Sequence, residues 1–147
     1  MKIAIGSDHR GLTVKQRVVP LLQHMGHEVT DVGPANPGSV DYPDFAFEVG
    51  KAIGDGRADR GILICGTGIG MCIAANKVHG VRAAPGQSDD EVRFTREHND
   101  ANVLTLGAKY MDEDRAMQLI EIFLNTEFAG GRHARRVAKI AQLEQPQ

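Results

Sequence analysis

Aromatic residues and cysteines are scarce in this sequence, and long apolar runs are missing. The chain has no tryptophan, and aromatic residues make up only 5% of it. Base stacking and membrane-interface belts both depend on aromatic side chains, and no stretch approaches the ~20 apolar residues of a membrane span. The formal net charge is −2 and the isoelectric point is near 6.3, which argues against a general nucleic-acid binder. We therefore expect no nucleic-acid or membrane partner.

Only two cysteines are present, Cys65 and Cys72. Two are too few for the disulfide framework of a small secreted protein, and their spacing fits neither a zinc knuckle nor a redox C-x-x-C pair. Residues 1–6 have neither the apolar region nor the cleavage site of a signal peptide. These features predict a cytoplasmic protein with reduced thiols.

The chain has 147 residues, of which 41% are apolar, and this composition predicts one domain over residues 1–147. Short apolar runs alternate with segments of helical periodicity. Strands are predicted at 2–6, 27–32, 61–65, 81–84 and 102–106, and helices at 12–25, 42–53, 70–77, 89–98, 111–124 and 132–143. This alternation predicts a three-layer α/β/α, Rossmann-like domain with a five-stranded parallel sheet.

Glycine, in contrast, is abundant: 17 of the 147 residues are glycine, about 12% against a usual ~7%. Gly66, Gly68 and Gly70 alternate directly after the predicted strand 61–65. Without side chains, such a turn lets backbone N–H groups approach a ligand, and the N-terminus of the following helix favours negative charge. The turn lacks the Gly-Lys-Ser/Thr ending of a P-loop and the G-x-G-x-x-G spacing of a dinucleotide site.

Cys65 begins this turn, where a helix N-terminus favours the thiolate, so it is a candidate general base. The alternative interpretation is that Cys65 is only the last apolar residue of a buried strand. Cys72 lies among alanines of the following helix, and packing is the favoured interpretation for it.

Two histidines lie beside carboxylates at the ends of predicted elements, His9 after Asp8 and His98 before Asp100. Such pairs suit acid–base chemistry. A metal site is the less favoured interpretation, because no His-x-x-x-His or Cys/His pairing accompanies them.

The last predicted helix is basic. Residues 130–147 carry four basic side chains and one acidic side chain, and Arg132, Arg136 and Lys139 lie on one helix face. Arginine suits the bidentate recognition of phosphate. A solvated helix face is the alternative, but a small phosphate site fits better than a nucleic-acid stripe.

Six stretches extend over nearly the whole chain: GSDHRG (6–11), DYPDFA (41–46), GILICGTGIGM (61–71), IAANK (73–77), HNDANVL (98–104) and GGRH (130–133). In this order they resemble the type B ribose-5-phosphate isomerases and the related allose-6-phosphate and galactose-6-phosphate isomerases. The resemblance implies an aldose–ketose isomerase that works through a cis-enediolate without metal or cofactor. It also implies a homodimer or homotetramer with shared active sites, in which the helix at about 132–143 reaches the partner subunit.

The resemblance assigns proton transfer between C1 and C2 to Cys65. One subgroup uses a glutamate where this chain has Met71, so the chain resembles the cysteine subgroup. Thr67 would assist proton transfer at the substrate oxygens, and His98 with Asp8 would open the sugar ring.

The other residues that the resemblance implicates would bind substrate. They are Asp8, Tyr42 and Asn99 for sugar hydroxyls, the backbone at Gly66, Gly68, Ile69 and Gly70 for the enediolate, and His9, Arg132, Arg136 and Lys109 for phosphate. Two positions depart from the family pattern. Lys109 replaces a usual arginine, and the segment 85–91 replaces a stretch that could border the sugar.

The expected reaction interconverts ribose 5-phosphate and ribulose 5-phosphate, a step of pentose phosphate metabolism. Isomerisation of allose or galactose 6-phosphate is the nearest alternative. A non-catalytic phosphosugar-binding module, with Cys65 only packing, is a second alternative, and a thiol-redox protein is a third.

Overall fold

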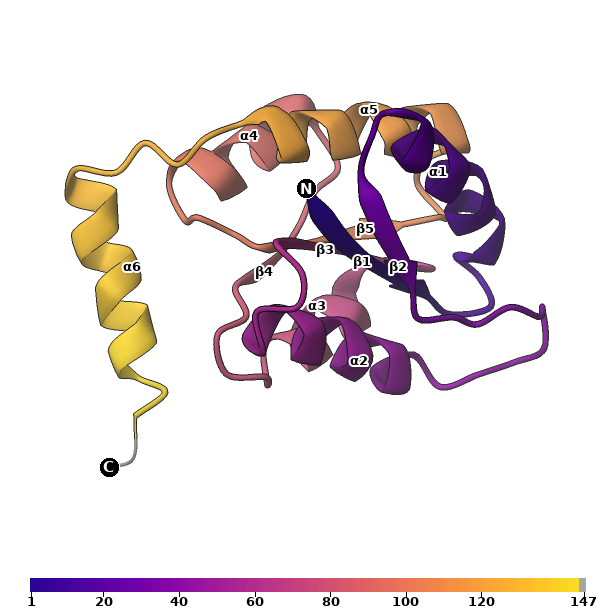
Figure 1. The fold of residues 1–147 in the computed structure, drawn as a ribbon, viewed down its shortest axis with the longest axis horizontal. Coiled ribbons are helices and arrows are strands. Elements are labelled where there is room, and N and C mark those ends of the chain that lie inside the picture. The colour runs from indigo at the N-terminus through magenta and orange to yellow at the C-terminus, as the bar shows by residue number, and fades with distance from the viewer. Residues whose placement is uncertain (146–147) are drawn as a thin grey trace.

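The computed structural model describes residues 1–145 (Figure 1). In chain order its elements are β1 (Lys2–Ser7), α1 (Leu12–His24), β2 (Glu28–Asp31), α2 (Tyr42–Gly54), β3 (Arg60–Cys65), α3 (Ile69–Ala75), β4 (Ala83–Pro85), α4 (Asp89–Glu97), β5 (Val103–Gly107), α5 (Glu113–Asn125) and α6 (Arg132–Gln142). Within this described range, no helix is long and apolar enough to cross a membrane.

The five strands form one parallel sheet in the order β2-β1-β3-β5-β4. The central strand β3 is apolar along almost its whole length because helices cover both faces of the sheet. This confirms the predicted α/β/α fold and its strand count.

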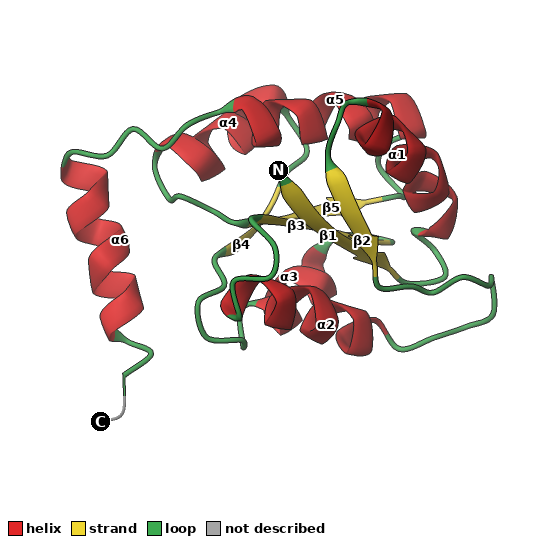
Figure 2. Cartoon of the chain, in the orientation of Figure 1, coloured by secondary structure: helices red, strands yellow, loops and turns green. Residues whose placement is uncertain are grey.

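Helices α1, α4 and α5 cover one face of the sheet, and α2 and α3 cover the other (Figures 1 and 2). Successive strand residues point to opposite faces. Ile62 and Ile64 therefore pack in the core beneath α1, α4 and α5, whereas Leu63 and Cys65 pack beneath α2 and α3.

Two predicted elements begin two residues later than expected. Strand β4 starts at Ala83 because the backbone N–H of Arg82 donates to the Asn102 side chain at 2.7 Å instead of to a neighbouring strand. Helix α5 starts at Glu113 because the Asp112 carboxylate accepts from a backbone N–H of its first turn.

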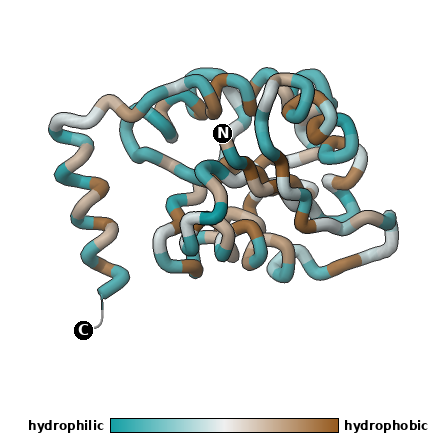
Figure 3. The backbone as a smooth tube through the Cα atoms, in the orientation of Figure 1, coloured by the Kyte–Doolittle hydropathy of each residue, from teal (hydrophilic) through white to brown (hydrophobic). Residues whose placement is uncertain are grey.

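Helix α6 lies apart from the three layers (Figure 1), and none of its residues is buried. Apolar residues alternate with polar ones along it without packing onto the sheet core (Figure 3). Its far end is held by the Glu144 carboxylate, which accepts from the backbone N–H of Gly80 at 3.0 and 3.1 Å.

Candidate active site

A cleft of about 460 Å³ lies where β1 and β3 end. Carboxyl ends of parallel strands are the usual ligand-binding edge of such sheets. The structure brings together there most of the predicted residues of the first half of the chain. The lining consists of Asp8, Arg10, Tyr42, Cys65, Gly66, Thr67, Ile69, Gly70 and Ile73.

The glycine-rich turn positions Cys65 and Thr67. Gly68 has a φ of +81°, which a residue with a side chain rarely adopts, and a Cβ there would lie 3.1 Å from the backbone of Leu106. In this conformation the Gly68 N–H donates to Cys65 Sγ at 3.1 Å. The Ile69 N–H donates to Thr67 Oγ1 at 3.2 Å. Two amides that the resemblance assigns to the enediolate thus donate hydrogen bonds to the Cys65 and Thr67 side chains.

The two cysteines have different surroundings. Cys65 is 5% exposed at the cleft, whereas Cys72 lies on α3 with its Sγ 3.4 Å from the carbonyl oxygen of Ala83. Burial raises the pKa of the Cys72 thiol, which disfavours its reactive thiolate. This agrees with the packing interpretation of Cys72.

Asp8 and Tyr42 line the cleft from two different segments of the chain. Asp8 is buried, and its Oδ1 accepts from the backbone N–H groups of Arg10 and Gly11 at 2.9 and 3.0 Å. Tyr42 begins α2, and its ring lies so close to Gly70 that a Cβ there would be 2.5 Å from Cε1. The absent side chain of Gly70 therefore makes room for the Tyr42 ring.

Two predicted phosphate ligands lie in turns at the same edge. His9 Nδ1 accepts from the backbone N–H of Val40 at 3.3 Å, so in the neutral ring the proton resides on Nε2. Lys109 has an exposed side chain, and its backbone N–H donates to the Gly66 carbonyl at 3.0 Å. Sequence reasoning missed Arg10 in the cleft wall, although its charge in the turn 8–11 was visible.

His98 and the predicted arginines of the basic helix belong to a second group of residues, outside the cleft. His98 ends α4, and its ring stacks between Phe94 and His133, with centroid distances of 4.8 and 4.5 Å. His133 belongs to α6, which also carries Arg132 and Arg136. This stack therefore joins the candidate ring-opening histidine to the basic helix.

The two clusters lie at opposite edges of the sheet. Helix α4 starts after β4 and runs back so that β5 can begin again at the amino edge. The end of α4 and the whole of α6 lie on the side where β1 begins (Figure 1). At ~3.3 Å per residue, strands of five or six residues separate the two edges by roughly 16–20 Å. Within one chain, therefore, the structure does not bring His98 to Asp8, or Arg132 and Arg136 to His9.

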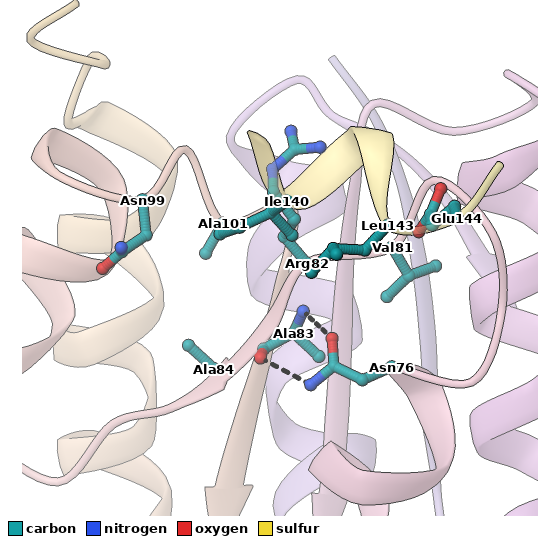
Figure 4. Close-up of a pocket in the computed structure, with 10 residues that line it drawn as sticks. All are labelled: Asn76, Val81, Arg82, Ala83, Ala84, Asn99, Ala101, Ile140, Leu143 and Glu144. Carbon is teal, nitrogen blue, oxygen red and sulfur yellow. Dashed lines mark hydrogen bonds between the residues drawn. The ribbon is translucent and has the colours of Figure 1, made fainter. Parts of the chain in front are cut away.

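Asn99 is also absent from the cleft. It lines a separate cavity of about 400 Å³ beneath α6, which Ile140, Leu143 and Arg82 also line (Figure 4). The Asn76 side chain there exchanges two hydrogen bonds with the backbone of Ala83, at 2.8 and 2.9 Å. None of the residues that line the cleft lines this cavity.

The segment 85–91 does not line the cleft either. It forms the start of α4: Ser88 Oγ accepts from the Glu91 N–H at 3.2 Å, and Glu91 Oε1 accepts from the Gln87 N–H at 2.8 Å. This pattern is close to a capping box. The unusual sequence thus serves the helix terminus in a single chain.

Residues 1–145 contain no group of three or more His, Cys, Asp or Glu side chains that could hold a metal ion.

Comparison with known proteins identifies the family. The ribose/galactose isomerase family matches residues 3–140. Ribose-5-phosphate isomerase B of Clostridium thermocellum is 50% identical, with a TM-score of 0.96 over 98% of this chain and 97% of that one. The Mycoplasma genitalium enzyme with bound ribulose-5-phosphate is 42% identical, with a TM-score of 0.96 over 99% and 97% of the two chains.

A further relative, the D-erythrulose-4-phosphate isomerase of Pectobacterium atrosepticum, is 42% identical over 98% of this chain and 95% of that protein. These matches extend over nearly the whole length of both partners. The chain therefore belongs to the ribose/galactose isomerase family and is an aldose–ketose sugar-phosphate isomerase.

Proposed function

We propose that this enzyme interconverts ribose 5-phosphate and ribulose 5-phosphate, with Cys65 as the base. The observation that carries the proposal is the pair of Cys65 Sγ and Thr67 Oγ1, each held by a backbone N–H in one small cleft. The Mycoplasma genitalium relative with bound ribulose-5-phosphate supports a five-carbon substrate.

The reaction needs one base and a proton shuttle between two oxygens. The Cys65 thiolate takes the C2 proton of the open aldose, the C–H electron pair forms the C1=C2 bond, and O1 becomes the oxyanion of a cis-enediolate. The Thr67 hydroxyl passes the O2 proton to O1. The C2=O bond then forms, C1 takes the proton back from Cys65, and the ketose results. Backbone N–H groups of the turn 66–70 stabilise the developing negative charge.

Cys65 is the better base of the two acidic groups beside the reacting carbons. Asp8 already accepts two backbone hydrogen bonds at Oδ1. These bonds occupy the lone pairs of that oxygen and hold the carboxylate toward the backbone of its own turn. Met71, which is fully buried on α3, has no ionisable group. Proton abstraction therefore rests on the thiol.

Ring opening and phosphate binding would be completed by a second copy of the chain. His98, Asn99, Arg132 and Arg136 of that copy would join Asp8 and the other residues of the cleft. A homodimer is the smallest assembly that completes the site, and a homotetramer would contain two such pairs.

Exposed apolar surface supports this arrangement. Ile69 and Ile73 at the cleft rim are 58% and 59% exposed, and burying such a side chain fully contributes about 1.5–3 kcal/mol. Ile140 of α6 and Leu143 directly after this helix are also exposed. An isolated helix of this length is marginal in water. Packing against another chain would stabilise both surfaces.

Steady-state kinetics on a panel of sugar phosphates tests the substrate. The panel contains ribose 5-phosphate, allose 6-phosphate, galactose 6-phosphate and erythrulose 4-phosphate, the last because of the Pectobacterium relative. We expect the highest kcat/KM with ribose 5-phosphate. A strong preference for a hexose or tetrulose phosphate would overturn the pentose assignment.

Solvent-deuterium exchange tests the base. The parent should incorporate deuterium at C1 and C2, and Cys65→Ala should lose this exchange, whereas Cys72→Ala serves as the matched control and should keep it. Equal exchange by Cys65→Ala and the parent would show that Cys65 is not the base. Binding of sugar phosphate by the parent without exchange would indicate a non-catalytic module.

A further inference from the structure

The cleft wall contains one permanently charged cation. Of the side chains that line it, only Arg10 is a lysine or arginine. Its backbone N–H donates to Asp8 Oδ1 at 2.9 Å, which fixes the start of the side chain in the turn after β1. Within residues 1–145, Arg10 takes part in none of the ion pairs. Its charge is therefore not neutralised by a carboxylate of its own chain.

The Arg10 side chain occupies space that a residue larger than glycine would take at position 66. A Cβ on Gly66 would lie 3.1 Å from Arg10 Cδ and 3.6 Å from Nη1. The first distance is tighter than an ordinary contact, so the glycine allows the arginine stem to cross the turn beside Cys65. Arg10 is an exposed residue whose Cδ and Nη1 atoms lie against the glycine-rich turn.

Two chemically different groups lie along the glycine-rich turn in the cleft. Arg10 lies beside Gly66, and the Gly66 carbonyl accepts from the backbone N–H of Lys109, which has an exposed, positively charged side chain. The Tyr42 ring lies beside Gly70, four residues further along the chain. A sugar phosphate has the same polarity, with a dianion at one end and hydroxyl groups along the rest.

We propose that Arg10 binds the phosphate of the substrate and is a substrate-binding residue in addition to those that the sequence indicated. Its planar guanidinium donates two parallel hydrogen bonds to phosphate oxygens, which the point charge of Lys109 cannot reproduce. This inference rests on the proposed function only for the identity of the sugar phosphate. The binding of phosphate itself is measurable without turnover.

The test uses calorimetry on the full-length Cys65→Ala protein, which binds without reacting. Arg10→Ala in this background should raise the Kd of both inorganic phosphate and ribose 5-phosphate about tenfold, the loss typical of a charge-assisted hydrogen-bonded pair. Arg10→Lys should recover only part of the affinity. Arg17→Ala, at an exposed arginine of α1, is the matched control and should leave both Kd values unchanged.

Gly66→Ala tests the same contact from the other side. It should weaken phosphate binding in the presence of Arg10, and it should have little further effect in the Arg10→Ala background. Unchanged Kd values for both ligands in Arg10→Ala, with the melting temperature preserved, would overturn the proposal. Arg10→Ala should also be made in the protein that retains Cys65. If it lowered kcat there while both Kd values in the Cys65→Ala background stayed unchanged, the proposal would be overturned, because Arg10 would then act at the reacting carbons. If the parent did not isomerise ribose 5-phosphate, the proposed substrate would be refuted. The Kd values for inorganic phosphate would still test whether Arg10 binds phosphate.

Discussion

Mixing two inactive variants, Cys65→Ala and Arg132→Ala, should restore isomerase activity. Cys65 lies at the carboxyl edge of the sheet and Arg132 begins α6 beyond the opposite edge. One sugar phosphate cannot reach both within a chain, because the edges are roughly 16–20 Å apart. A symmetric dimer in which each site takes Cys65 from one chain and Arg132 from the other resolves this geometry.

The expected magnitude follows from the symmetry. Each pure variant has a defect in both of its sites. In a mixed dimer, one site carries both substitutions and the other carries neither, so the mixed dimer should have about half the activity of the parent. Equal mixing with random pairing makes about half of the dimers mixed, so the mixture should reach about one quarter of the parent activity before selection and about one half after selection for mixed dimers.

The assay co-expresses the two chains with different tags and measures conversion of ribose 5-phosphate after both tags have been selected. A mixture of Cys65→Ala with Thr67→Ala is the matched control. Both of these residues lie in the same cleft, so every site in that mixed dimer retains one defect. If native mass spectrometry verifies mixed dimers and the Cys65→Ala/Arg132→Ala pair is no more active than the control, shared sites are refuted.

The remaining predictions concern the ion pair of a buried lysine, the cleft wall and the docking of α6. The Lys15 side chain is 1% exposed, and its Nζ lies 2.8 Å from Oδ1 of Asp31, whose side chain is 40% exposed, so Asp31→Asn should lower the free energy of unfolding by about 2 kcal/mol. Urea unfolding should show a smaller loss for Lys15→Met, and equal losses would contradict the role of the uncompensated charge. Gly70→Ala places a methyl group 2.5 Å from the Tyr42 ring, and because that ring is 40% exposed it can turn outward. We expect about a tenfold loss of kcat/KM with little change in melting temperature, and an undiminished kcat/KM would show that the ring position is unimportant. Desolvation, together with neighbouring positive groups, lowers the pKa of His133 below 6.5, so its stack is favoured above pH 6.5 and weakens as the pH falls below it. Proton NMR titration should show the lowered pKa of His133, and hydrogen exchange of α6 should become faster as the pH falls below 6.5. A pKa of 6.5 or higher would contradict this prediction.

Local sequence patterns were sufficient for the order of elements. The uninterrupted apolar run 61–65 predicts a buried parallel strand, and the structure confirms it as β3. The first residue of an element was less predictable where a side chain, instead of the backbone, accepts a hydrogen bond from a backbone N–H. The Asn102 side chain accepts from Arg82 before β4, and the Asp112 side chain accepts from Arg115 at the start of α5.

Much of the candidate site was also visible in the sequence. The glycine-rich turn after β3 pointed to Cys65, and the strand ends of an α/β sheet predict where such a turn lies. The crossing of Arg10 over Gly66 was not visible, because that contact joins turns 56 residues apart in the chain and depends on β1 lying beside β3. The same holds for the hydrogen-bonded start of α4 at Ser88, in a segment that the family resemblance placed beside the sugar.

The sequence by itself therefore determined the α/β fold and the glycine-rich turn, and it singled out Cys65 as the candidate base, because these depend on periodicity and on residues that are adjacent in the chain. Only the tertiary structure decided which candidates meet. It joined Cys65 with Thr67, Asp8 and Tyr42 in one cleft, and it put His98 and α6 at the opposite edge. The reason is that a helix joining two parallel strands must run back across the sheet before the next strand can begin. The residues at the end of that helix therefore lie at the opposite edge from the carboxyl ends of the strands.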